Sequence, residues 1–288
     1  MSETFKLKLK NRGRFKTIFS SPHSGRNYLK AFLENTALEI DELRSSEDAF
    51  IGEIFEGAVN YGSAFLEANF PRCFIDLNRS HLELDPKLIE GNFEFESSAK
   101  NFAGLGVIPR LSGMGNPIYK GTLSFDEVQK RLKEFYFPFH ETLANLILSA
   151  KTSFGYAVLF DCHSMPSSFR SIEGFGSRSN SIDIVLGDLN GVSCNRYLTE
   201  MAKDIFERHG FSVKINRPFA GGFITKNYGN PTQRVHALQL EINRGLYMNE
   251  EKIELNEDFP AFKETFLEII KELSSLPIFE EFNEVAAE

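Results

Sequence analysis

Cysteine is scarce in this sequence, and its few cysteines are widely separated. The chain of 288 residues contains only Cys73, Cys162 and Cys194. Three scattered thiols provide neither a disulfide framework nor a closed zinc site built from thiolates. This cysteine content fits a reducing compartment, and we therefore expect a cytoplasmic protein.

Long apolar runs are absent as well. No segment of the sequence approaches the roughly 20 apolar residues that are needed to cross a bilayer. The first residues, MSETFKLKLKNRGRF, alternate charged and apolar groups, whereas a secretory signal carries a continuous apolar stretch. We expect neither a membrane segment nor secretion.

Positive charge does not predominate. The formal net charge of −8 opposes a general attraction to nucleic acid phosphates, and no basic cluster is interleaved with aromatic residues. The short basic stretch at residues 6–16 is typical of an exposed edge strand, where lysines discourage unwanted pairing. We therefore expect no nucleic acid partner, and the sequence indicates no particular oligomeric state.

Apolar residues are abundant enough to fill one large core. They make up 42% of the chain and include 29 phenylalanines, so we expect a single domain over residues 1–288. Predicted strands alternate with predicted helices, which indicates a three-layer α/β sandwich with a mixed, mostly parallel sheet. The strands are expected at residues 17–20, 72–77, 156–160, 182–186, 211–215 and 235–242, and the helices at 47–60, 125–148, 195–209 and 259–274.

Polar side chains lie near the ends of several predicted strands. His23 lies in the turn SPHSG, His163 in the segment DCHSMP, and Glu241 near the end of the last strand. Taken alone, each histidine is more often a hydrogen-bonded residue of the core than a ligand. Because ligands of α/β proteins collect outside the carboxyl ends of the strands, we expect these side chains to lie together.

Two neutral imidazoles and one carboxylate leave a coordination position for water, which is the composition of a catalytic zinc site. Asp48 and Glu47, at the start of a predicted helix, are the candidates for the carboxylate. Acidic residues are also favoured there by the helix dipole alone. We favour Asp48 as the third ligand, and Glu47 stays open as the alternative.

Glu241 interrupts an apolar strand, where an unpaired charge is costly. It is either a general base beside a metal site or the ion-pair partner of Arg244 or Arg217. The segment DLNR places Asn78 next to Arg79, whose planar fork suits the α-carboxylate of an amino acid.

Arg72 lies seven residues before Arg79 and is a candidate for stabilising a developing oxyanion. The alternative is that these arginines pair with acidic residues at the surface of a chain that holds 40 of them.

Several segments together resemble the N-formylglutamate amidohydrolase (deformylase) family, within the wider zinc carboxypeptidase and aspartoacylase-like group. The resemblance implies a phosphorylase/hydrolase-like fold and a divalent metal, usually Zn²⁺. In zinc carboxypeptidase-like enzymes an acid follows the first histidine by three positions, but Arg26 stands there and cannot coordinate a cation. The segments are SPHSG, EDAFIGEIFEGA, PRCFIDLNRS, DCHSMP, GGFITKNYG and HALQLEINRGLYMNE.

The resemblance also implies roles for individual residues. His23 and His163 match the metal histidines, Asn78 and Arg79 the carboxylate grip, Arg72 the oxyanion arginine and Glu241 the catalytic glutamate. The implied activity is hydrolysis of N-formyl-L-glutamate, or a similar N-acyl amino acid, to formate and glutamate, as in histidine degradation. Alternatives are another N-acyl amino acid amidohydrolase, a carboxypeptidase-like peptidase, or a carboxylate-binding protein without metal.

A glutamate substrate needs a second cation for its side-chain carboxylate. The candidates are Arg170 and Arg244, with Arg178 and Arg217 also open. The glycine-rich segment at residues 220–229 is either a mobile flap or a plain turn, and residues 105–120 form either an active-site loop or a connection. Asp161 is a candidate for orienting His163.

Overall fold

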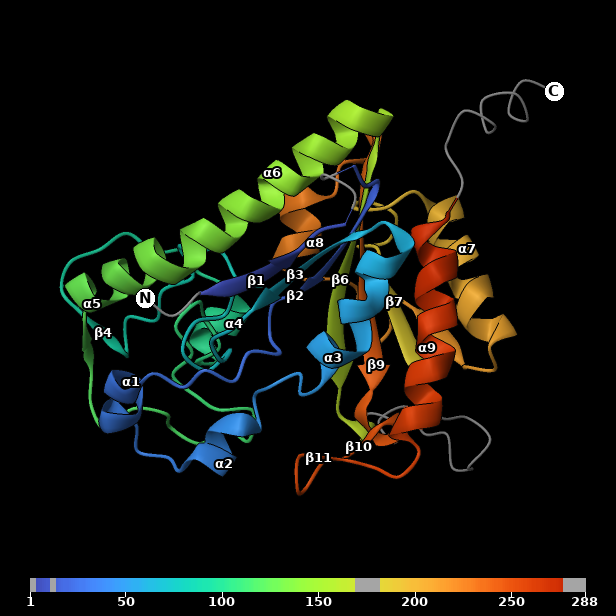
Figure 1. Ribbon diagram of the computed structural model, residues 1–288. Coiled ribbons are helices and arrows are strands. Elements are labelled where there is room, and N and C mark those ends of the chain that lie inside the picture. Colours follow the sequence, from blue (N-terminus) through green and yellow to red (C-terminus); the bar gives the residue numbers. More distant parts are fainter. Residues whose placement is uncertain (1–3, 11–13, 169–181, 277–288) are drawn as a thin grey trace.

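The computed structural model describes residues 4–10, 14–168 and 182–276. The predicted substrate contacts Arg170 and Arg178 lie outside the described residues. Within them, one central sheet is flanked by helices on both faces (Figure 1). The predicted three-layer α/β sandwich is therefore confirmed.

Among the described residues, the central sheet has seven strands in the order β1-β3-β2-β6-β9-β7-β8. β1 is antiparallel to β3 and β7 is antiparallel to β9, whereas the other neighbouring pairs are parallel, as predicted. β1 is an edge strand, as expected, and overlaps the start of the basic stretch at residues 6–16. The strands are β1 Phe5–Lys8, β2 Thr17–Ser21, β3 Ala64–Ala68, β6 Ala157–Met165, β7 Ile184–Gly187, β8 Val213–Ile215 and β9 Val235–Asn243.

Two groups of helices cover the two faces of the sheet (Figure 1). One face carries α6 Phe137–Phe154 and α8 Phe223–Tyr228, and the other carries α3 Ile51–Phe55, α7 Arg196–Arg208 and α9 Phe259–Ser274. No helix in the described ranges is both long and apolar enough to span a membrane. Shorter elements are α1 Lys30–Asn35, α2 Ile40–Arg44, α4 Ala99–Phe102, α5 Phe125–Arg131, and the pairs β4 Ile89–Glu90 with β5 Leu123–Ser124 and β10 Met248–Asn249 with β11 Glu254–Leu255.

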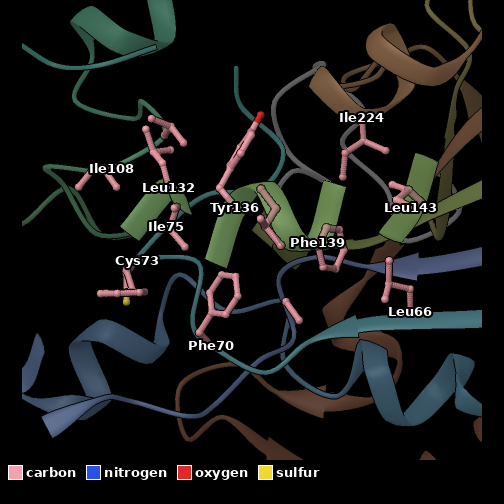
Figure 2. Packing of buried hydrophobic residues seen from close by; sticks show 14 of the residues in the cluster. Leu66, Phe70, Cys73, Ile75, Ile108, Leu132, Tyr136, Phe139, Leu143 and Ile224 are labelled. Carbon is pink, nitrogen blue, oxygen red and sulfur yellow. The ribbon is translucent and has the colours of Figure 1, made fainter. Parts of the chain in front are cut away.

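Strand alternation divides the core into two hydrophobic clusters. Leu159 of β6 belongs to the cluster beneath α6, whereas its neighbour Phe160 belongs to the cluster beneath α3, α7 and α9. Figure 2 shows part of the first cluster, in which Phe139 and Leu143 of α6 lie near Leu66 of β3. Odd-numbered residues of β6 therefore point towards the α6 face of the sheet. His163, near the end of the strand, follows the same alternation.

The predicted strand at residues 72–77 is wrong. The strand in this region is β3, which ends at Ala68, and the chain then forms turns in which the amide of Phe74 donates to the carbonyl of Pro71 at 3.0 Å. Phe74, Ile75 and Leu77 are nevertheless buried. Their apolar pattern, which was interpreted as a strand, comes from packing a loop against the core.

Other boundaries differ from the prediction because tertiary contacts extend or shorten the elements. β6 continues to Met165 since it pairs with β9 along its whole length, so His163 lies within the strand and not after it. The helix predicted at residues 47–60 begins only at Ile51 and becomes a 3-10 helix from Glu56. The helix predicted at residues 125–148 contains a π-helical turn at Leu132–Tyr136.

Candidate active site and metal centre

The site lies where three parallel strands of the sheet end. His23 follows β2 by two residues, and His163 of β6 is the register partner of Glu241 of β9. Leu159 and Ala237 pack beneath α6 earlier in the same two strands. Because side chains alternate, His163 and Glu241 point to that same face, which is apolar in the strand centres and polar at their carboxyl ends.

His23, Asp48 and His163 meet at this edge and are all buried. Asp48 Oδ2 lies 3.3 Å from His23 Nδ1 and 3.0 Å from His163 Nδ1. Asp48 arrives from the loop before α3, and its amide donates to the carbonyl of His23 at 3.0 Å. The prediction that these three side chains lie together agrees with the structure.

The far nitrogen of each histidine ring faces another carboxylate. Asp76 Oδ1 lies 2.7 Å from His23 Nε2, and Asp161 Oδ2 lies 2.8 Å from His163 Nε2. The Asp161 contact is out of line for a hydrogen bond, and neither carboxylate oxygen of Asp161 has such a partner among the described residues. At His23, the hydrogen-bonded carboxylate of Asp76 favours the proton on Nε2 and leaves Nδ1 as the free ligand atom.

The second carboxylate oxygen of Asp48, Oδ1, is hydrogen-bonded on the side away from the histidines. Asp48 Oδ1 accepts hydrogen bonds from Ser164 Oγ at 3.2 Å and from Arg244 Nη2 at 3.1 Å. Burial raises the pKa of Asp48, but its contacts with His163 and His23 outweigh the effect of burial and hold the pKa well below its usual value. The carboxylate is therefore ionised, with Oδ2 directed at the two imidazoles.

Neither Glu47 nor Arg26 enters this cluster. Glu47 Oε1 accepts a hydrogen bond from Tyr28 Oη at 2.7 Å. The guanidinium of Arg26 lies over the ring of Phe50, 4.3 Å from its centroid, and its Nη2 is 3.5 Å from Glu53. Arg26 is therefore directed away from the histidines, so its position in the sequence does not block the site.

The three side chains fit a divalent metal ion. Their ligand atoms lie within 4.8 Å of one another, and two imidazole nitrogens with one carboxylate oxygen form the donor set of a catalytic zinc site with an open position. Tetrahedral ligands at about 2.0 Å from zinc are roughly 3.3 Å apart. The two separations of 3.0 and 3.3 Å at Asp48 Oδ2 are close to that value.

Glu241 lies beside this cluster and is buried. Its Oε1 accepts a hydrogen bond from Gln239 Nε2 at 2.8 Å, and among the described residues it forms no ion pair with Arg244 or Arg217. Burial raises the pKa of Glu241 to about 7. A carboxyl group with a pKa near neutrality can both accept and release a proton.

A cavity of about 570 Å³ opens in front of these residues. This volume suits a small molecule. Leu105, Pro109 and Leu111 line it from the long connection, and Gly221 and Gly222 line it from the glycine-rich segment. Both segments considered from the sequence therefore border the cavity, and the mobile-flap interpretation stays a prediction. The polar lining includes His23, Asp48, Arg72, Asp76, Asn78, Arg79, Lys100, His163, Gln239, Glu241 and Arg244.

Arg72 and Arg79 project into the cavity from the loop that follows β3. Arg72 Nε donates to Asp76 Oδ2 at 2.9 Å, and its two terminal nitrogens have no hydrogen-bond partner among the described residues. Arg79 is held by its Nε, which donates to the carbonyl of Leu105 at 3.0 Å, and by its Nη1, which donates to the carbonyl of Asn78 at 2.8 Å. Its Nη2 has no such partner in the described ranges.

Asn78 connects the histidine cluster to the glycine-rich segment. Its Oδ1 accepts from the amide of Ile224 at 2.8 Å, and its Nδ2 lies 3.3 Å from His163 Nε2. A Cβ at position 222 would stand 2.4 Å from Asn78 Nδ2, so only glycine fits at Gly222.

Sequence reasoning missed Lys100 and Gln239, because a single lysine in a polar stretch and a single glutamine in a strand carry no distinctive pattern. Asp76 was noted only as part of its motif, and its place behind His23 required the fold. Arg217 is exposed and does not line the cavity, and Arg244 lines it while holding Asp48.

The resemblance noted in the sequence extends to known proteins. A family model described as N-formylglutamate amidohydrolase matches residues 15–248. The N-formylglutamate deformylase of Pseudomonas putida is 32% identical over 245 residues, which cover 83% of this chain and 84% of that protein. The N-formylglutamate deformylase of Pseudomonas aeruginosa is 31% identical over 243 residues, with 83% and 85% covered.

Solved structures agree with the sequence matches. The crystal structure of N-formylglutamate amidohydrolase from Ralstonia eutropha JMP134 matches with a TM-score of 0.87 and 30% identity, covering 94% of this chain and 97% of that one. A protein from Agrobacterium tumefaciens shares the fold with a TM-score of 0.66 at 14% identity, covering 95% and 96%. The matching family model and the deformylase relatives show that this chain belongs to the N-formylglutamate amidohydrolase family.

Proposed function

We propose that this protein is a metal-dependent amidohydrolase that cleaves the formamide C–N bond of N-formyl-L-glutamate to give formate and glutamate. The observation that carries the proposal is the meeting of two histidine Nδ1 atoms with Asp48 Oδ2, beside a buried glutamate and an arginine-lined cavity. The names of the relatives supply the substrate.

His23, Asp48 and His163 are the residues that would hold the metal, either Zn²⁺ or another divalent ion. When bound, such an ion lowers the pKa of water towards neutrality and acts as a Lewis acid on a carbonyl oxygen. Asp76 orients the imidazole of His23 through its hydrogen bond, and Arg244 and Ser164 orient the carboxylate of Asp48. Asp161 lies 2.8 Å from His163 Nε2 and places a second negative charge beside that ring.

Glu241 transfers the proton in this proposal. Its carboxylate accepts a proton from the water that attacks the formyl carbon, while Gln239 fixes the orientation of the carboxyl group. It then gives that proton to the amine nitrogen as the C–N bond breaks. Water is consumed, and formate and glutamate are released.

The arginines bind and stabilise the charged parts of the substrate. The terminal nitrogens of Arg72 face the cavity and stabilise the negative charge that develops on the formyl oxygen. Arg79 and Asn78 bind the α-carboxylate, and Arg79 is pre-organised for this because two carbonyls already fix its Nε and Nη1.

The proposed substrate is tested by comparing N-formyl-L-glutamate, N-acetyl-L-glutamate and a glutamyl dipeptide with the metal-loaded protein. We expect the formyl compound to have the highest kcat/KM. Faster hydrolysis of either other substrate would replace the deformylase assignment by a different acyl or peptide specificity.

The first prediction concerns the metal ligands. His23→Ala and His163→Ala should weaken metal binding by more than about 100-fold, because changes in residues that only orient a ligand already cost about 10–100-fold. Asp48→Asn should also weaken it sharply. Metal content, measured by elemental analysis after purification without chelators, checks this together with far-ultraviolet circular dichroism.

Glu47→Gln is the matched control for Asp48→Asn. Glu47 lies next in sequence and is equally buried, but its carboxylate contacts Tyr28 and not the histidines. The control should keep its metal. Full metal occupancy in both histidine variants would falsify the ligand assignment.

The second prediction concerns Glu241. Glu241→Gln keeps the size of the side chain and removes its basicity, so kcat should fall by about 10²–10⁴-fold while metal content stays unchanged. Steady-state kinetics of the metal-loaded variant measure this. Near-normal turnover would leave Glu241 with a structural role, and loss of metal would make it a ligand.

The third prediction concerns Arg79. Arg79→Lys keeps the charge but loses the two hydrogen bonds that a guanidinium can make to one carboxylate. The value of kcat/KM for N-formyl-L-glutamate should therefore fall, and the loss should correspond to roughly 2–4 kcal/mol of activation free energy. An N-formyl amine without a carboxylate should be hydrolysed at an unchanged rate. The exposed Arg217→Lys serves as the control, and equal losses on both substrates would contradict a role in reading the carboxylate.

A further inference from the structure

Lys100 of α4 lines the cavity but has no part in the proposed mechanism. It is exposed, and its amino group forms no ion pair or hydrogen bond among the described residues. We propose that Lys100 binds the side-chain carboxylate of the substrate, so that the cavity selects N-acyl amino acids with two carboxylates. This inference rests on the proposed function and adds the residue that would set its substrate class.

The backbone ties Lys100 to Arg79. The amide of Leu105 donates to the carbonyl of Lys100 at 2.9 Å, and the carbonyl of Leu105 accepts from Arg79 Nε at 3.0 Å. One short turn therefore fixes the positions of both cations. Both side chains line the same cavity, so a substrate held by its α-carboxylate at Arg79 would occupy the space that Lys100 borders.

The base of Lys100 is also anchored on its other side. Asn101 Nδ2 donates to the carbonyls of Leu84 at 2.7 Å and Glu96 at 3.1 Å, and Ser98 caps α4 by accepting from the amide of Asn101. The backbone of Lys100 is thus fixed, and only its side chain needs to move to reach a ligand.

The charges around the cavity leave Lys100 available for an anion. Arg72 pairs with Asp76, Arg244 pairs with Asp48, and Arg79 lies 3.9 Å from Asp76. Among the cations that line the cavity in the described part of the chain, Lys100 therefore lacks a carboxylate partner. Partial burial of its amino group and the neighbouring charges of Arg79 and Arg72 lower the pKa of Lys100.

The chemistry of the two cations matches the two carboxylates. The planar fork of Arg79 suits the α-carboxylate, which must be placed accurately relative to the scissile amide. The ammonium group of Lys100, on a flexible stem, suits a carboxylate at the end of a flexible substrate side chain. Arg244 and Arg217 are the other described candidates for binding the side-chain carboxylate. Arg244 Nη2 donates to Asp48 and to the carbonyl of Glu47, and Arg217 does not line the cavity.

The test compares N-formyl-L-glutamate with N-formyl-L-glutamine, whose side chain has nearly the same shape but no charge. Lys100→Met should lower kcat/KM for the glutamate compound by about tenfold, mainly through KM, and change that for the glutamine compound by less than about twofold. Lys100→Arg should restore part of the loss. Lys130→Met, which alters an exposed lysine of α5 outside the cavity lining, is the matched control.

The outcomes separate this inference from the proposed function. Equal losses on both substrates, or no loss on either, would overturn the role of Lys100 while wild-type hydrolysis of N-formyl-L-glutamate still supports the deformylase activity. Absence of turnover by the metal-loaded wild type on both compounds would contradict the proposed function and remove the basis of this inference with it. Unchanged metal content in Lys100→Met checks that the histidine cluster is intact.

Discussion

The buried charge of Asp48 is the constraint on which the site depends. Removing a carboxylate from water costs several kcal/mol unless nearby donors or cations compensate for it. Here the compensation comes from His23 after β2, from His163 and Ser164 of β6, and from Arg244 after β9. The ends of three adjacent strands and the loop before α3 are thereby held in one arrangement.

A second network fixes the loop that carries Asn78 and Arg79. Burial lowers the pKa of His140 to about 4, so its imidazole is neutral and has one donor and one acceptor. Its Nε2 donates to the carbonyl of Leu77 at 3.0 Å, and its Nδ1 accepts from Tyr228 Oη at 2.8 Å. Tyr136, at the end of the π-helical turn, donates to the carbonyl of Arg79 at 2.7 Å. The irregular helix thus holds the loop without using the side chains that face the cavity.

The architecture and the meeting of His23, Asp48 and His163 could be predicted from the sequence, because parallel strands bring their carboxyl ends to one edge. The sequence predicts a strand at residues 72–77 where the chain forms a loop, since the burial of Phe74 and Leu77 resembles a strand pattern. Local pattern does not distinguish burial within a sheet from burial beneath a helix. The sequence favours Asp48 as the third ligand but leaves Glu47 open. In the structure both are buried and their partners differ, since Asp48 contacts the histidines and Glu47 contacts Tyr28.

The distribution of charge indicates that recognition acts at short range. The chain as a whole carries a formal charge of −8, which disfavours the approach of a dianion, whereas Arg72, Arg79, Lys100 and Arg244 gather around one cavity. At physiological ionic strength the Debye length is about 8 Å, so distant acidic residues are screened while cations lining the cavity are not. An anionic ligand such as the proposed substrate would therefore respond chiefly to the cations that line the cavity.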